Sequence, residues 1–70
     1  MKQLRREQAL LSEARAARIV NLSTRTLQKW RSLGVGPSYV RLRGAVRYRL
    51  SDLKAFIDRG LRLTEGERNE

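Results

Sequence analysis

Apolar residues recur at helical spacing in residues 13–20. The residues expected to face inward there, with one just ahead of the segment, are Leu11, Ala14, Ala17 and Val20. Ser12 comes before the segment, and serine is a favoured N-cap. Asn21 follows it and is one of the few non-glycine residues that tolerate a left-handed helix end. The pattern predicts a short helix over residues 13–20.

A second helix is predicted to begin after Ser23 and to end near Gly34. Leu27 and Trp30 stand three apart, so both lie on one face of this helix and are expected to point into the core. The polar residues left facing outward are Thr24, Arg25, Gln28, Lys29 and Arg31. Since about three residues join the two helices, they form a helix-turn-helix.

Residues 39–50 alternate between apolar and basic side chains, which is typical of a strand pair with one buried face. The side expected to face inward contains Val40, Leu42, Val46, Tyr48 and Leu50. The side expected to face outward contains Arg41, Arg43, Arg47 and Arg49. Gly44 marks a tight reversal, so the segment is predicted to be a β-hairpin with four arginines on its outer face.

A third helix is predicted over residues 52–59, with Ser51 as its N-cap and Gly60 at its end. The fold class is therefore mainly α with a β-hairpin, a winged helix-turn-helix in the order helix, helix, hairpin, helix. The expected organisation is a flexible basic arm at 1–10, a DNA-binding domain at 11–61 and a disordered tail at 62–70.

The charge of the chain indicates what kind of partner this small domain binds. The chain has 16 Lys and Arg against 7 Asp and Glu, a formal net charge of +9. No acidic residue stands between Glu13 and Asp52, whereas basic residues are frequent there. Such a block is typical of a surface that binds a polyanion.

Several kinds of site are excluded by composition. The chain contains no cysteine and no histidine, so cysteine or histidine zinc sites and histidine acid–base catalysis are excluded. No apolar run reaches the length of a membrane span, and no signal-type segment follows the N-terminus. We expect a cytoplasmic, nucleoid-associated protein of bacterial or phage origin with no enzymatic activity, cofactor, metal, membrane or small-molecule partner.

The order of short motifs resembles the excisionase-like, MerR-type family of small DNA-binding proteins. The motifs are Leu11-Ser12-Glu13-Ala14, Ala16-Ala17, Leu22-Ser23, Thr26-Leu27 with Trp30, Val46-Arg47-Tyr48-Arg49 and Ser51-Asp52-Leu53-Lys54-Ala55-Phe56. The resemblance covers about residues 10–58. It implies that the second helix enters the major groove while the wing contacts the backbone or minor groove. The wing tip is expected at Gly44-Ala45, where the family usually has a basic pair.

DNA contacts are predicted on the second helix and on the wing. The residues expected to contact bases are Thr24, Arg25, Gln28 and Lys29, because arginine pairs with guanine and glutamine with adenine. The residues expected to contact the DNA backbone are Ser23, Thr26, Arg31, Arg41, Arg43, Arg47, Arg49 and Arg18. The expected partner is thus double-stranded DNA.

The leading hypothesis for function is an excisionase, or recombination directionality factor. Such a factor binds adjacent sites, bends the DNA and assists an integrase, with neighbouring copies of itself as possible partners. The alternative is a small helix-turn-helix transcriptional regulator. More distant alternatives are an RNA-binding module and a module that binds an acidic protein through the wing.

Overall fold

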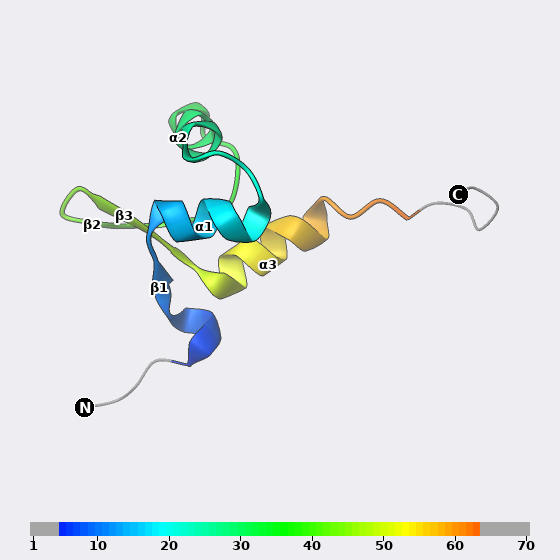
Figure 1. The fold of residues 1–70 in the computed structure, drawn as a ribbon, viewed down its shortest axis with the longest axis horizontal. Helices are drawn as coiled ribbons and strands as arrows, with labels where there is room; N and C mark the ends of the chain where they lie inside the picture. Colours follow the sequence, from blue (N-terminus) through cyan, green and yellow to red (C-terminus); the bar gives the residue numbers. More distant parts are fainter. Residues whose placement is uncertain (1–4, 64–70) are drawn as a thin grey trace.

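The computed structural model describes residues 5–63 and contains three helices with a small antiparallel sheet (Figure 1). The elements are η1 (Arg6–Gln8), β1 (Leu10–Leu11), α1 (Glu13–Val20), α2 (Thr24–Leu33), β2 (Val40–Leu42), β3 (Ala45–Arg49) and α3 (Leu50–Arg59). The predicted winged helix-turn-helix is confirmed. The outer parts of the predicted arm and tail, residues 1–4 and 64–70, lie outside the described residues.

The ends of α1 and α2 are formed by the residues that the sequence predicts. The Oγ atoms of Ser12 and Ser23 each accept a hydrogen bond from the amide of the third helical residue, at 3.2 Å and 3.1 Å. Asn21 ends α1 with a φ of 58°, and Gly34 ends α2 with a φ of 75°. Both are left-handed conformations that stop a helix and release the chain in a new direction.

The start of α3 differs from the prediction by two residues. The helix begins at Leu50, and its N-cap is Arg49, which makes no side-chain cap. Strand β3 runs directly into the helix, so no separate capping residue intervenes. Asp52 in the first turn accepts a hydrogen bond from Arg49 Nε at 2.8 Å, and its negative charge suits this end of the helix.

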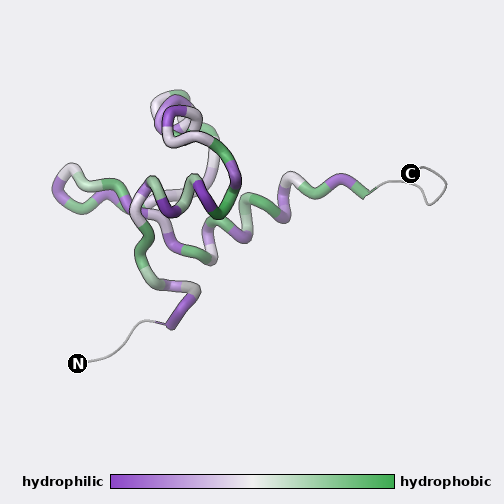
Figure 2. The backbone as a smooth tube through the Cα atoms, viewed as in Figure 1, coloured by the Kyte–Doolittle hydropathy of each residue, from purple (hydrophilic) through white to green (hydrophobic). Residues whose placement is uncertain are grey.

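The core is small and lies where the three helices meet β3. Its buried residues are Ala16, Ala17, Leu27, Tyr48 and Leu53. Trp30 packs against this cluster as predicted, with its ring centroid 5.6 Å from that of Phe56. Along α1 and α3, hydrophilic and hydrophobic residues alternate with the turns of the backbone (Figure 2).

The inward stripe predicted for α1 is wrong at one residue. Ala14 is exposed, and Ala16, which the prediction left out, is fully buried. Helix α1 packs against both α2 and α3, so its buried stripe follows residues 13, 16, 17 and 20. Glu13 therefore occupies the first position of a stripe that is otherwise apolar.

A third strand, β1, was not predicted. Leu10 pairs with Arg49 and Leu11 with Tyr48, so β3 is the central strand in the order β1-β3-β2. Two residues are too few to show an alternating pattern in the sequence. The strand lies at the boundary between the predicted arm and the predicted domain, and those domain limits stay a prediction.

The register of the hairpin divides the arginines between its two faces, and the prediction of one four-arginine face is wrong. Arg41 pairs with Val46, and Val40 pairs with Arg47. Paired residues in an antiparallel sheet share a face. Arg41 thus lies on the face of the buried Tyr48, whereas Arg47 lies on the opposite face.

The turn of the hairpin explains this difference. Its two central residues are Arg43 and Gly44, with φ values of 50° and 91°. Positive φ at both positions is characteristic of the two-residue type I′ turn. The prediction places the even-numbered residues of both strands on one face, which requires an odd number of residues in the turn. With two residues in the turn, each even-numbered residue pairs with an odd-numbered one, so the side chains of one strand lie on the faces opposite to those predicted.

Candidate nucleic-acid interface

Helix α2 presents one continuous exposed stripe on the side away from the buried Leu27. Its members are Arg25, Gln28, Lys29 and Ser32, which stand at the spacing i, i+3, i+4 and i+7. Three of these were predicted to contact bases, as was Thr24, which is exposed at the start of the helix. Ser32 was missed, although the helical spacing of the other three points to it.

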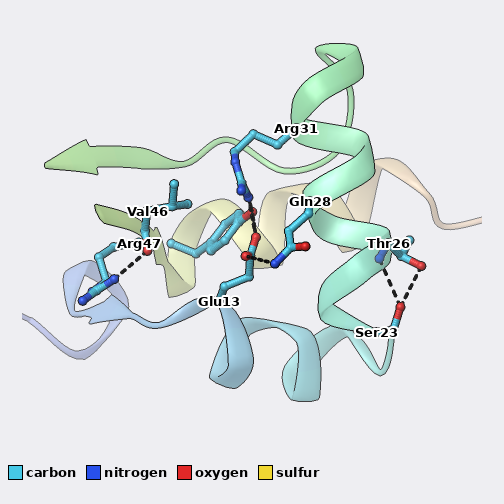
Figure 3. Close-up of polar contacts among 8 residues, drawn as sticks. Glu13, Ser23, Thr26, Gln28, Arg31, Val46 and Arg47 are labelled. Atoms are coloured by element: carbon cyan, nitrogen blue, oxygen red, sulfur yellow. Dashed lines mark hydrogen bonds and ion pairs between the residues drawn. The ribbon is translucent and has the colours of Figure 1, made fainter. Parts of the chain in front are cut away.

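Ser23 and Thr26 form the N-terminal end of α2. Besides capping the helix, Ser23 Oγ lies 3.0 Å from Thr26 Oγ1, so each hydroxyl is already engaged by the other (Figure 3). The first turn contains no acidic residue. The partial positive charge of this helix end is therefore uncompensated, which favours a nearby phosphate.

The edge of α2 that faces the hairpin is organised around Glu13. One carboxylate oxygen, Oε1, accepts from Gln28 Nε2 at 3.1 Å. The other, Oε2, accepts from Tyr48 Oη at 3.1 Å and forms an ion pair with Arg31 Nη1. Figure 3 shows Glu13, Gln28 and Arg31 meeting in the space between α1, α2 and the hairpin. We call Glu13, Gln28, Arg31 and Tyr48 the Glu13 network.

The charges in the Glu13 network follow from its contacts. Burial alone would raise the pKa of Glu13, but hydrogen bonds from Arg31, Gln28 and Tyr48 outweigh burial and lower that pKa. Burial is also the main cause that raises the pKa of Tyr48. At neutral pH the network therefore holds a carboxylate, a guanidinium and a neutral phenol.

Two arginines predicted to contact phosphate already have carboxylate partners. The Arg31 side chain is only 19% exposed and also donates to Tyr48 Oη at 3.2 Å. Arg49 pairs with Asp52 through Nε and Nη2. An arginine whose charge is already neutralised by a carboxylate releases fewer counterions when it contacts a phosphate. Arg31 and Arg49 should therefore contribute less to DNA affinity than the other predicted phosphate contacts.

The other wing arginines have different surroundings. Arg41 lies with its guanidinium carbon 5.7 Å from the ring centroid of Tyr39, and Arg31 approaches the same ring at 5.7 Å. Arg47 Nη1 donates to the carbonyl of Val46 at 2.8 Å. Arg43 is exposed at the turn itself. The wing tip is therefore Arg43-Gly44 and carries a charge, in place of the predicted Gly44-Ala45.

Six of the eight basic side chains predicted to contact DNA form no ion pair with the described carboxylates, which are those of Glu13, Asp52 and Asp58. They are Arg18, Arg25, Lys29, Arg41, Arg43 and Arg47. Arg18 is exposed on α1, outside the α2 stripe. The structure thus brings Arg25, Gln28 and Lys29 together on α2 and Arg41 and Arg43 on the neighbouring wing.

No group of three potential metal ligands occurs among residues 5–63. None of the helices in that range is long and apolar enough to span a lipid bilayer.

Comparison with known proteins agrees with this geometry. The family model described as a helix-turn-helix domain matches residues 10–60, which span every element from β1 to α3. No curated protein and no solved structure matches the chain. Since the match covers well over half of the sequence, the chain belongs to the helix-turn-helix domain family, a family of small DNA-binding domains that includes excisionase-like members.

Proposed function

We propose that this protein is an excisionase-type factor that binds adjacent sites on double-stranded DNA, bends the duplex and assists an integrase. Membership in the helix-turn-helix family supports sequence-specific binding of double-stranded DNA. The order of motifs from Leu11 to Phe56, which resembles the excisionase-like, MerR-type proteins, supports the more specific role.

A single observation carries the DNA-binding part of the proposal. The exposed stripe Arg25, Gln28, Lys29 and Ser32 lies on one helix, with no carboxylate on that helix. Arginine, glutamine and lysine are the side chains that pair with base edges in the major groove. We propose that this stripe and Thr24 read bases, as recognition helices do.

The DNA backbone is proposed to be bound by basic and hydroxyl side chains outside this stripe. Arg18, Arg41, Arg43 and Arg47 would contact phosphates, with Ser23 and Thr26 at the start of α2. Arg31 and Arg49 are not part of the proposed set, because Glu13 and Asp52 already neutralise their charge.

Salt dependence tests the size of this contact set. Four arginines on phosphates predict a log–log slope of affinity against salt of about −4. A slope near zero in a fluorescence anisotropy titration would contradict binding through phosphates, and a slope of about −5 or steeper would bring the paired arginines back into the interface.

In vitro selection from random duplexes, followed by footprinting on the winning sequence, tests the role. Tandem direct repeats of one motif are expected for an excisionase. A single inverted repeat would instead support the second candidate, a dimeric transcriptional regulator. The absence of any enriched motif at moderate salt would contradict both.

An RNA-binding role fits the aromatic side chains less well. Recognition of single-stranded RNA uses exposed aromatics on which bases stack. Of the four aromatic residues in the chain, only Tyr39 is exposed, and arginines lie against its ring. Competition between duplex DNA and single-stranded RNA separates the two roles, and stronger binding of RNA would overturn the proposal.

A further inference from the structure

Among the described side chains, Gln28 is the one member of the α2 stripe whose side chain is hydrogen-bonded to another residue. Its Nε2 donates to Glu13 Oε1 at 3.1 Å, although the side chain is exposed to solvent. We propose that Glu13 is a positioning residue that sets the base preference of α2 by fixing which end of the Gln28 amide faces the DNA. The inference rests on the proposed function, since it concerns how the same helix reads bases.

The chemistry of the Glu13 network leaves one orientation for the amide. An ionised carboxylate can only accept hydrogen bonds. Glu13 Oε2 is occupied by Arg31 and Tyr48, and both of these act as donors toward it. Glu13 Oε1 therefore requires a donor from Gln28. The amide nitrogen must turn toward Glu13, which leaves the amide oxygen on the outer side.

The anchor for this orientation is rigid. Glu13 is the first residue of α1, follows the Ser12 cap, and has a side chain that is 17% exposed. Tyr48 is 1% exposed in the middle of the core, on the central strand of the sheet. A group supported by packed helices and strands holds its orientation better than one supported by a loop.

The outward amide oxygen has a definite consequence for base preference. In the major groove, adenine N6 and cytosine N4 are donors, whereas guanine O6 and thymine O4 are acceptors. An outward amide oxygen on Gln28 can accept a hydrogen bond from adenine N6 or cytosine N4, whereas it repels guanine O6 and thymine O4. Adenine fits best, because its N7 can also accept the second Nε2 hydrogen. The base pair that Gln28 reads should favour adenine, then cytosine.

The variant Glu13→Gln reverses this logic while keeping the size and shape of the side chain. Arg31 can only donate, so the oxygen of the new amide must face Arg31, and its nitrogen must face Gln28. Gln28 then turns its own oxygen toward residue 13 and its Nε2 toward the DNA. We expect a change of preference from adenine or cytosine to guanine or thymine at that one base pair.

The experiment first locates the base pair and then tests its preference. Selection with the full-length chain gives the motif, and Gln28→Ala identifies the pair at which discrimination is lost. Dissociation constants are then measured for four duplexes that differ only at this pair. For Glu13→Gln, the preferred and rejected duplexes should exchange, with a change in their ratio of about tenfold or more.

Two further variants keep the test decisive. Asp52→Asn removes the same amount of charge from the Arg49 pair, so it should strengthen binding of all four duplexes alike and leave their order unchanged. If Glu13→Gln is unfolded by thermal melting, Glu13→Met takes its place. Methionine lacks any strong acceptor, so discrimination at this pair should fall about tenfold while other pairs are unaffected.

Each outcome assigns failure to one proposal. If the wild-type chain selects no motif, the DNA-binding proposal fails. If it selects a motif but Gln28→Ala relaxes no base pair, only the present inference fails. The inference also fails if Glu13→Gln keeps the wild-type order of the four duplexes, or if Asp52→Asn changes that order in the same way.

Discussion

Arg25 and Arg31 lie on the same helix and carry the same charge, but their surroundings differ. Arg25 is exposed, and its side chain has no hydrogen-bond or ion-pair partner among the side chains that the structure describes. Arg31 is largely covered, pairs with Glu13 and donates to Tyr48. One side of α2 is thus available to a ligand, while the other connects the helix to α1 and the hairpin.

Positive charge alone therefore does not identify a DNA contact. The position of the few carboxylates decides which arginines are neutralised. On the wing, the same distinction separates Arg49, which pairs with Asp52, from Arg43 at the turn. The arginines of the described residues therefore divide into those that pair with Glu13 or Asp52 and those for which DNA contacts are proposed, and variants of matched size can tell the two groups apart.

The largest effect is expected for stability when Arg31 is replaced. Arg31→Met removes hydrogen bonds to Glu13 and Tyr48 and leaves a partly buried carboxylate with fewer partners. The free energy of unfolding should fall by about 1.5–3 kcal/mol, measured by urea denaturation. Arg25→Met is the matched control and should stay within about 0.5 kcal/mol of wild type. Equal losses in the two variants would remove the distinction between the two sides of α2.

The reverse pattern is expected for base recognition. Arg25→Met should reduce discrimination at one base pair by about 1–3 kcal/mol, measured as dissociation constants on duplexes that vary at that pair. Arg31→Met should leave discrimination at that pair unchanged at temperatures where it is folded. A uniform loss of affinity for all duplexes in Arg25→Met would instead indicate a phosphate contact.

Replacement of Arg43 should change the stability of the fold and the binding of DNA in opposite directions. Its φ of 50° is unfavourable for arginine and tolerable for asparagine, which is the residue most suited to a type I′ turn before glycine. Arg43→Asn should raise the free energy of unfolding by up to about 1 kcal/mol. The salt slope of DNA binding should become shallower by about 0.9.

Arg43→Gln serves as the control for this wing variant. It removes the charge without supplying a residue suited to the left-handed conformation. Its salt slope should match that of Arg43→Asn, and its stability should stay close to that of wild type. An unchanged slope in both variants would place the wing tip outside the DNA interface.

The smallest effect is expected on the pH dependence of stability, through protonation of the Glu13 carboxylate. Its pKa in the folded state is lowered from 4.5, so its contribution to stability is complete above that value. The contribution is lost as the pH falls through the folded-state pKa. Urea denaturation from pH 7 to pH 3 should show wild type losing stability relative to Glu13→Gln below pH 4.5. Parallel curves would contradict the lowered pKa.

The local features of this fold could be predicted from the sequence. The ends of α1 and α2 are set by capping residues, whose hydrogen bonds and steric preferences involve only neighbours within one helical turn. These residues are Ser12, Ser23, Asn21 and Gly34. The pairing of Leu27 with Trp30 follows from helical spacing. These features by themselves determined two helices with an exposed donor-rich stripe.

Tertiary structure decided the features that depend on residues distant in the sequence. Gln28, Arg31 and Tyr48 meet Glu13 only because α1, α2 and β3 pack together, so no local pattern marks Glu13 as their shared partner. The faces of the wing depend on a turn of two residues in place of three, a difference of one residue that the alternating pattern does not resolve. Local preferences extend over a single turn, whereas the choice of partner depends on how whole elements pack.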